Sequence, residues 1–487
     1  MKNKFDPDFG SALDAAAAIR ARQISSAELT EHTLRRIDAF QPQLNAYVYQ
    51  LREEALESAR KADEAIARAG ALGALHGVPI NVKESFGVQG RPCTWGVPAL
   101  ANSKAPRHAV AVRRLLDAGA ILLGATNVPL HLMDCQSFND IYGTSNNPWD
   151  LTRTPGGSSG GSAASLAAGM AFFSVGSDIG GSIRTPAAFC GIYGHKPTLD
   201  IVNMAGHAPG GLYASPGFST LLSVGGPMAR SAEDLEAGLR ILAGLEAPDA
   251  KALQWTLPKA RHQSLREFRV GYVLEDPAVP VSSEIKTVLE SVIRACERAG
   301  AKVKPGWPDA SRFRELLDTY LFLLGAFDFS IRPPEIQQQT RDRLAARSDA
   351  FAKGAISDFA AWQRRNLKRL AFRAVWEEYF NSVDVFLLPT AFTTAIPHDY
   401  TPPDARVIPT PEGDTRAFVD MVTYISPATL TGCPATTAPA GLSRSGLPVG
   451  LQIVGPYLED ATPIAFSQLL AREIGGFQPP GGYGSLS

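Results

Sequence analysis

The sequence predicts an α/β fold, because helical and strand patterns alternate along much of its 487 residues. Residues 108–118 have helical spacing and end at Gly119, and an apolar run from Ala120 to Ala125 follows. The same order recurs in a helical pattern from Ser162 to Gly169 and an apolar run from Ala171 to Val175. Unbroken apolar strands are typical of sheets that helices cover on both faces.

The N-terminal region begins with helices. Residues 11–40 keep helical spacing, with Ser25 and Ser26 as caps, and a second helix is expected from about residue 51 to residue 69. A short strand pattern then runs from Val78 to Lys83, in which apolar and polar residues alternate. Lys83 therefore ends a predicted strand.

The C-terminal half also alternates between helical and strand patterns, except for one long helical block. Ser231 begins a helix that ends at Gly244, and residues 245–266 predict a loop or subdomain boundary. Further strands are expected at 269–274, 383–391 and 447–455, with helices at 282–300 and 462–475. Between them, residues 309–380 are almost wholly helical in pattern and rich in aromatic residues, which predicts a helical insertion or cap within a single domain of residues 1–487.

Composition limits the class of partner. The 47 basic and 48 acidic residues give a net charge of -1, and no run of one sign suggests nucleic acid or a membrane surface. The five cysteines lack the spacing of a zinc site or a disulfide framework, so neither is expected, and buried, reduced thiols are the default. No segment has the roughly 18 apolar residues that span a bilayer. We expect a cytoplasmic protein that acts on a small molecule, with a homodimer left open.

Two glycine and serine clusters stand out, at 156–162 and 180–182. Glycine allows sharp turns and close approach of the backbone, so serines presented there suggest a site. The first cluster admits a flexible turn, or a G-x-S-x-G elbow with Ser158 as nucleophile, although the preceding residues form a poor strand. In the second cluster, Ser182 follows a buried strand, and the backbone N–H groups before it can form an oxyanion hole.

The stretches GVPINVKESF, TPGGSSGGSAA, SDIGGSIRTPAAFCGIYGHKPT, SVGGPMARSAEDL and TGCPATTAPAGLSRSGLPVGLQIVG occur in this order. Together they resemble the amidase signature family over residues 11–474. The resemblance implies an α/β/α sandwich around a large, mixed, twisted sheet. It also implies an amidohydrolase without a metal or cofactor.

Site residues follow from the same resemblance. It implies a Ser-Ser-Lys triad with Ser182 as nucleophile, Ser158 as the bridging serine in a cis peptide, and Lys83 as base. The oxyanion hole maps to the N–H groups of Ile179, Gly180, Gly181 and Ser182. Burial favours the neutral form of a lysine, which a base requires.

Other residues have smaller expected roles. Asp178 and Arg184 flank Ser182 with opposite charges and predict an ion pair that fixes the loop, and Gly157 lessens steric conflict before Ser158. Leu132, Met133 and Asp134 lie where the family commonly lines the acyl pocket, although core packing explains the first two equally well. Two further residues have structural interpretations: Lys196, which could compete as a base, and Cys190, a buried thiol.

The predicted activity is hydrolysis of a carboxylic acid amide to an acid and an amine or ammonia, through an acyl-serine intermediate. The aromatic block at 309–380 favours an apolar or aryl substrate if it covers the site. Alternatives are ester or carbamate hydrolysis on the same triad, a glutamine amidotransferase subunit, and, from another class, a catalytically silent binding protein.

Overall fold

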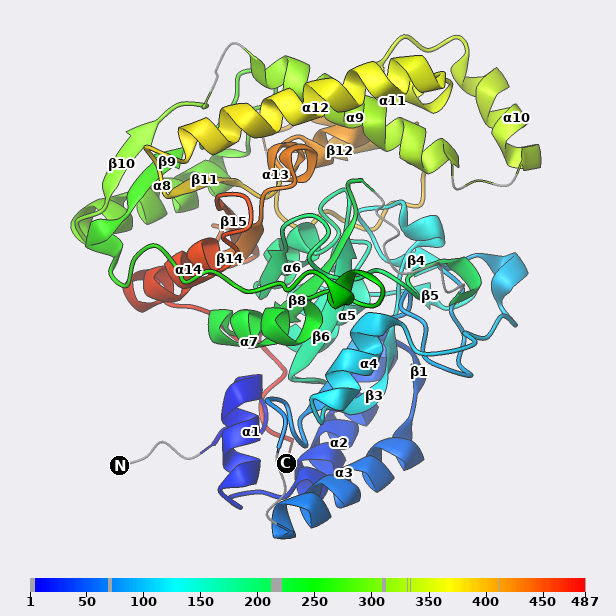
Figure 1. Cartoon of the computed structure of the whole chain (residues 1–487), viewed down its shortest axis with the longest axis vertical. Helices are drawn as coiled ribbons and strands as arrows, with labels where there is room; N and C mark the ends of the chain where they lie inside the picture. Colours follow the sequence, from blue (N-terminus) through cyan, green and yellow to red (C-terminus); the bar gives the residue numbers. More distant parts are fainter. Residues whose placement is uncertain are drawn as a thin grey trace.

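A large mixed sheet forms the centre of the protein (Figure 1). The computed structural model describes residues 5–68, 72–211, 221–308, 312–330, 332, 334–410 and 412–486. In these residues the sheet has 11 strands, in the order β1-β3-β2-β6-β8-β7-β14-β15-β11-β9-β10. The pairs β4–β5 and β12–β13 form two small separate sheets.

The strands are short and mostly buried. Their bounds in chain order are β1 Tyr47–Gln50, β2 Pro79–Lys83, β3 Ile121–Thr126, β4 Phe138–Asn139, β5 Gly143–Thr144, β6 Phe173–Asp178, β7 Tyr193–Lys196, β8 Val224–Ala229, β9 Arg269–Tyr272, β10 Lys302–Pro305, β11 Val385–Pro389, β12 Val407–Pro409, β13 Thr415–Ala417, β14 Ala435–Leu442 and β15 Pro448–Val454. Strand β2 pairs in parallel with both β3 and β6. Strands β8, β7, β14 and β15 continue the sheet through antiparallel pairs.

Helices cover both faces of this sheet. Their bounds are α1 Ala12–Arg20, α2 Ser26–Leu44, α3 Arg52–Ala67, α4 Val110–Asp117, α5 Gly160–Ala167, α6 Arg184–Cys190, α7 Ala232–Leu242, α8 Ser283–Arg298, α9 Phe313–Ser330, α10 Pro334–Leu344, α11 Ala350–Ala355, α12 Phe359–Tyr379, α13 Ser426–Thr431 and α14 Ala461–Ile474. Along β3, Ile121 and Leu123 join one apolar cluster and Leu122 joins another, as alternation in a doubly covered strand requires. The predicted α/β fold with a mixed sheet is confirmed.

Some predicted elements differ in extent. Residues 11–40 form two helices, because Arg22 has a left-handed backbone (φ 56°) and Ser25 caps the second helix by accepting from the Glu28 N–H. The predicted end of the next helix at residue 69 lies outside the described residues. Strands β1, β7, β8, β10 and β14 had no prediction.

Four helices, α9 to α12, account for the predicted helical region and lie at one end of the molecule, opposite α1 to α3 (Figure 1). The predicted start of this helical region, Asp309, lies outside the described residues. Helices α9 and α11 approach closely at two glycines. A Cβ on Gly325 would lie 2.1 Å from the Phe351 carbonyl oxygen, and one on Gly354 would lie 1.9 Å from that of Phe322. Larger residues at either glycine would separate the helices.

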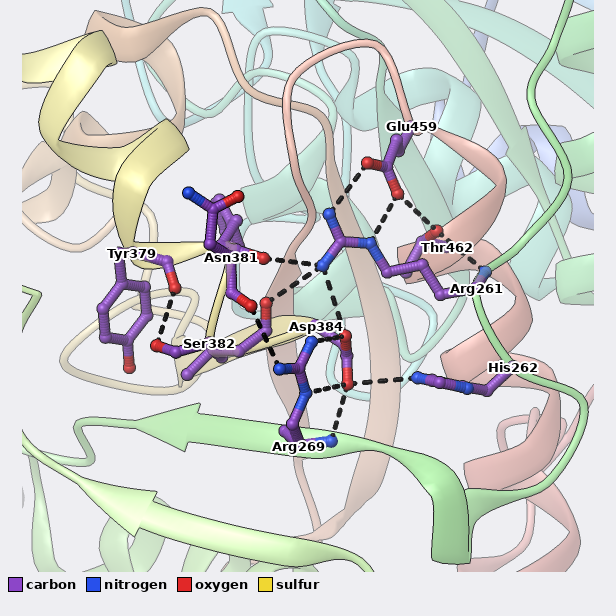
Figure 2. A network of polar contacts seen from close by, with 11 residues as sticks. Arg261, His262, Arg269, Tyr379, Asn381, Ser382, Asp384, Glu459 and Thr462 are labelled. Carbon is purple, nitrogen blue, oxygen red and sulfur yellow. Dashed lines mark hydrogen bonds and ion pairs between the residues drawn. The ribbon is translucent and has the colours of Figure 1, made fainter.

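Residues 245–266, predicted as a loop or boundary, are anchored to the sheet at Asp384 (Figure 2). This buried carboxylate accepts hydrogen bonds from Arg261, His262 and Arg269. Burial would raise the pKa of Asp384, but bonds from Arg269 and Arg261 prevail and lower it to about 2. Arg261 also pairs with Glu459 just before α14, so one charge network joins the loop, the sheet and the last helix.

In the described ranges, no helix is both long and apolar enough to cross a membrane.

Candidate active site

The first glycine and serine cluster forms a tight turn before α5. A Cβ on Gly157 would lie 2.3 Å from the carbonyl oxygen of Gln136 and 2.4 Å from that of Asp134, so only glycine fits. The peptide bond between Gly157 and Ser158 is cis, as the resemblance implies. Ser158 itself is buried. The turn therefore delivers its hydroxyl into the interior of the protein.

Lys83 ends β2 and is 0% exposed. Alternation along the strand puts it on the same face as Asn81, whose amide donates to Ser165 of α5, whereas Val82 joins the apolar cluster on the other face. This direction brings the Lys83 Nζ to 2.6 Å from the Ser158 Oγ and 2.9 Å from the Ser177 Oγ. The strand thus aims the amine at the start of α5.

Burial lowers the pKa of Lys83 to about 7, against the opposing effect of the negative charges of Asp178 and Glu84. Glu84, the next residue, accepts hydrogen bonds from the backbone N–H groups of Thr94 and Trp95, and burial raises its pKa to about 7. Burial therefore favours the neutral form of Lys83. A neutral amine can accept a proton from a hydroxyl.

The second cluster is held by Asp178, at the end of β6. Its carboxylate accepts from the backbone N–H groups of Gly181 and Ile183, and pairs with the Arg184 guanidinium at 2.7 Å. Both side chains of the pair are fully buried. Although burial would raise the pKa of Asp178, Arg184 and the other partners lower it. The expected ion pair thus clamps the turn that carries Ser182.

Arg184 extends this clamp to the C-terminal part of the sheet. Its Nη1 donates to the Ile425 carbonyl and the Gln452 Oε1, and its Nη2 donates to the Thr429 Oγ1. Ile425 directly precedes α13, Thr429 lies within α13, and Gln452 lies on β15. The serine-bearing turn is therefore fixed to two further elements.

The two clusters meet at one backbone hydrogen bond, from the Ser159 N–H to the Ser182 carbonyl at 3.2 Å. The structure thus brings Lys83 into direct contact with Ser158 and brings the Ser158 and Ser182 turns together. Among the described residues, the Ser182 Oγ has no hydrogen bond to Ser158 or Lys83. Ser182 is also buried, with an exposed fraction of 6%.

The four N–H groups expected to form the oxyanion hole do not have equal surroundings. That of Gly181 donates to the Asp178 Oδ1 at 3.1 Å. Within the described part of the chain, those of Ile179, Gly180 and Ser182 have no protein acceptor. These three N–H groups are the candidate donors to a ligand oxygen.

The three residues predicted to line the acyl pocket differ in their surroundings. Leu132 packs against the apolar cluster of Cys93, Trp95 and Ala105. Asp134 receives two hydrogen bonds from Arg406, at 2.7 and 2.9 Å, which ties its carboxylate to another part of the chain. Met133 is half-buried. The pocket assignment stays a prediction.

Two neighbours of the triad had no sequence prediction, namely Ser177 and Tyr320. Ser177 is a second acceptor for Lys83, and the Tyr320 hydroxyl donates to the Ile179 carbonyl at 3.0 Å. The position of Ser177, just before Asp178, offered a weak signal. Tyr320 offered none, because it is 141 residues from its partner.

Cys190 and Lys196 are both buried. The Cys190 thiol contacts the Pro155 carbonyl, and burial raises its pKa well above the ordinary value, so it stays a thiol. In the described residues, no group of three or more His, Cys, Asp or Glu side chains is arranged to hold a metal ion.

Known proteins share both the sequence pattern and the fold. The model of the Amidase family matches residues 28–463. A glutamyl-tRNA(Gln) amidotransferase subunit of Chloroflexus aggregans is 33% identical over 480 residues, which cover 92% of this chain and 93% of that protein. A bacterial aryl acylamidase of the amidase signature family superposes with a TM-score of 0.79 at 26% identity, covering 96% of this chain and 97% of the other. Another structure, described as an amidase, has a TM-score of 0.77 at 27% identity, with 95% and 100% covered.

A mixed sheet between helices, with a buried lysine hydrogen-bonded to a serine, is the arrangement of an α/β enzyme. The chain belongs to the amidase signature family and is a hydrolase of amide C–N bonds. A Ser-Ser-Lys triad is the general feature of this family.

Proposed function

We propose that the protein hydrolyses a carboxylic acid amide through an acyl intermediate on Ser182, with Ser158 as proton relay and Lys83 as base. The observation that carries this proposal is the 2.6 Å hydrogen bond between the Lys83 Nζ and the Ser158 Oγ. Burial supports it by lowering the pKa of Lys83 to about 7.

The steps follow from these contacts. The Ser182 Oγ attacks the amide carbon and gives its proton to Ser158, while Ser158 gives its own proton to Lys83. Donors at Ile179, Gly180 and Ser182 stabilise the oxyanion. The proton returns through Ser158 to the leaving nitrogen, and the amine departs. Water then attacks the acyl group by the same route, which releases the acid and restores Ser182.

An apolar or aryl acyl group is the proposed substrate class. Ile179 of the proposed oxyanion turn packs against an apolar cluster that includes Leu222, Tyr320 and Ile425. A wall of this kind favours an uncharged, apolar ligand. Turnover rates for anilides, alkyl amides, esters and carbamates test the class, and preference for a charged acyl group would contradict it.

The helical region 309–380 is proposed as an insertion or cap within a single domain of residues 1–487. Its helix α9 supplies Leu316, Tyr320 and Leu323 to the cluster that contacts Ile179. This packing connects the helices to the proposed site. The homodimer and the cytoplasmic location stay predictions from the sequence.

The nucleophile is tested by reaction with an alkyl fluorophosphonate, in which the serine oxygen bonds to phosphorus and fluoride leaves. Intact mass should show one adduct on the parent protein and none on Ser182→Ala. Ser174→Ala is the matched control, because Ser174 lies on β6 but bonds to Ser162 rather than to Lys83. An adduct of normal yield on Ser182→Ala would exclude the assignment, and an unreactive parent would favour a silent binding protein.

A glutamine amidotransferase subunit is the second candidate, favoured by relatives such as the one from Chloroflexus aggregans. Such a protein would release ammonia from glutamine for a partner. Glutaminase activity above the anilide activity, together with co-purifying partner proteins, would support this candidate over a free-standing amidase.

A further inference from the structure

One contact joins the helical region to the proposed oxyanion hole. Tyr320 of α9 is 0% exposed, and its hydroxyl donates to the carbonyl oxygen of Ile179 at 3.0 Å. Burial raises the pKa of Tyr320, so the hydroxyl stays protonated and remains a donor. The side chain comes from a helix that supplies no member of the triad.

This carbonyl belongs to the same peptide group as the N–H of Gly180. The C=O and N–H of a planar trans peptide point in opposite directions, so fixing one fixes the other. A hydrogen bond to the carbonyl also polarises the group, which strengthens the N–H as a donor. The Gly180 N–H is one of the three that have no protein acceptor in the described residues.

We propose that Tyr320 is a positioning residue for the oxyanion hole, which it serves by holding the Ile179–Gly180 peptide so that the Gly180 N–H faces the reacting oxygen. The inference rests on the proposed function of Ser182. It makes the helical region part of the catalytic apparatus as well as a cover.

The surroundings of Tyr320 suit this role. It belongs to the same buried apolar cluster as Leu316, Phe372 and Ile425. A Cβ on Gly180 would lie 3.7 Å from the Tyr320 hydroxyl, so the hydroxyl sits directly against the turn. In the next peptide group, the Gly181 N–H donates to the Asp178 carboxylate. Two successive peptide groups of the turn are therefore each held by a side chain.

Tyr320→Phe removes only the hydroxyl and tests the proposal. We expect the second-order rate of reaction with an alkyl fluorophosphonate to fall about tenfold, less than the loss caused by removing an oxyanion donor. For the best amide substrate, kcat should fall by a similar factor with KM unchanged. The apparent pKa of the rate profile should not move, because Lys83 is untouched.

Tyr47→Phe is the matched control. Tyr47 is also buried, and its hydroxyl donates to a backbone carbonyl, that of Met170, at 2.8 Å and accepts from the Asn81 amide at 3.0 Å. Tyr47→Phe should therefore lower Tm at least as much as Tyr320→Phe, but it should react at the parental rate.

The outcomes separate the two proposals. If the parent forms no adduct on Ser182, the proposed function fails. If the parent reacts and Tyr320→Phe reacts within twofold of it, the role of Tyr320 is overturned. An equal loss of rate in Tyr47→Phe, or a change in KM alone, would also overturn it.

Discussion

Lys83 and Lys196 offer a comparison between two buried amines at the ends of two strands. Their exposed fractions are 0% and 1%. Burial lowers the pKa of Lys83 to about 7 and that of Lys196 to about 8. By burial and pKa alone, either lysine qualifies as a general base.

Their hydrogen-bond partners differ. The Lys83 Nζ donates to the hydroxyls of Ser158 and Ser177, whereas the Lys196 Nζ donates to the carbonyl oxygen of Pro197. A hydroxyl can pass a proton to a neutral amine, but a carbonyl has no proton to give. The positive charge of Arg184 also helps to lower the pKa of Lys196. A lowered pKa therefore does not identify the base, and the partner does.

The largest expected effect is on turnover. Lys83→Met should lower kcat/KM for the best amide by roughly two to four orders of magnitude, the contribution of a general base. Lys196→Met keeps a side chain of similar length and should retain kcat/KM within about tenfold of the parent, since it removes no proton acceptor. Steady-state kinetics at pH 8 measure both, and equal losses would invalidate the distinction.

The second-largest expected effect is on the pH dependence of kcat/KM. Protonated Lys83 cannot accept a proton, so kcat/KM should rise with pH through an apparent pKa near 7. The charged or titratable groups that act on Lys83 are Asp178, Glu84 and His207. Lys196→Met should show the same rise of kcat/KM with pH. If the rise is absent in that variant, the group that titrates is Lys196.

Glu84→Gln sharpens the pH prediction. The negative charge of Glu84 favours the protonated form of Lys83. Its removal should therefore move the rise of kcat/KM to lower pH. A pH profile of kcat/KM for this variant measures the direction. A shift to higher pH would show that Lys83 is not the group observed.

The smallest effect, on stability, should be shared by both lysines. The folded pKa of Lys83 is about 7 and its ordinary value is 10.5, so between these values the unfolded chain binds more protons. Its contribution to stability therefore rises with pH over that range. The Tm of Lys83→Met relative to the parent should be highest at pH 7 and fall towards pH 10, with Lys196→Met behaving similarly. A relative Tm that increases with pH would contradict this.

Much of the fold could be predicted from the sequence, because buried strands such as β3 and β11 are largely continuous apolar runs that follow helical patterns. Strand β8 could not, since its Gly225, Gly226 and Pro227 are typical of turns, and its pairing with β6 and β7 decides its structure. The predicted single helix over 11–40 was wrong because Arg22 adopts a left-handed backbone there.

The triad residues could be predicted because they lie in long motifs. These motifs include glycines that no larger residue could replace without a clash, such as Gly157. Tyr320 could not be found in the same way, because its hydrogen bond to Ile179 depends on how α9 packs against the turn. The pairing of Asp134 with Arg406 was equally hidden, since 272 residues separate them.

The parallel pairing of β2 with β6, in which Val82 lies opposite Val175, has a consequence for engineering. Side chains on a strand change face at every residue, so a slip of one position would carry Lys83 to the opposite layer, away from Ser158. A variant in which the register slipped in this way would lose turnover even where the chain still folds. Screens of variants for retained solubility would overlook such damage, whereas a reactive serine probe would detect it.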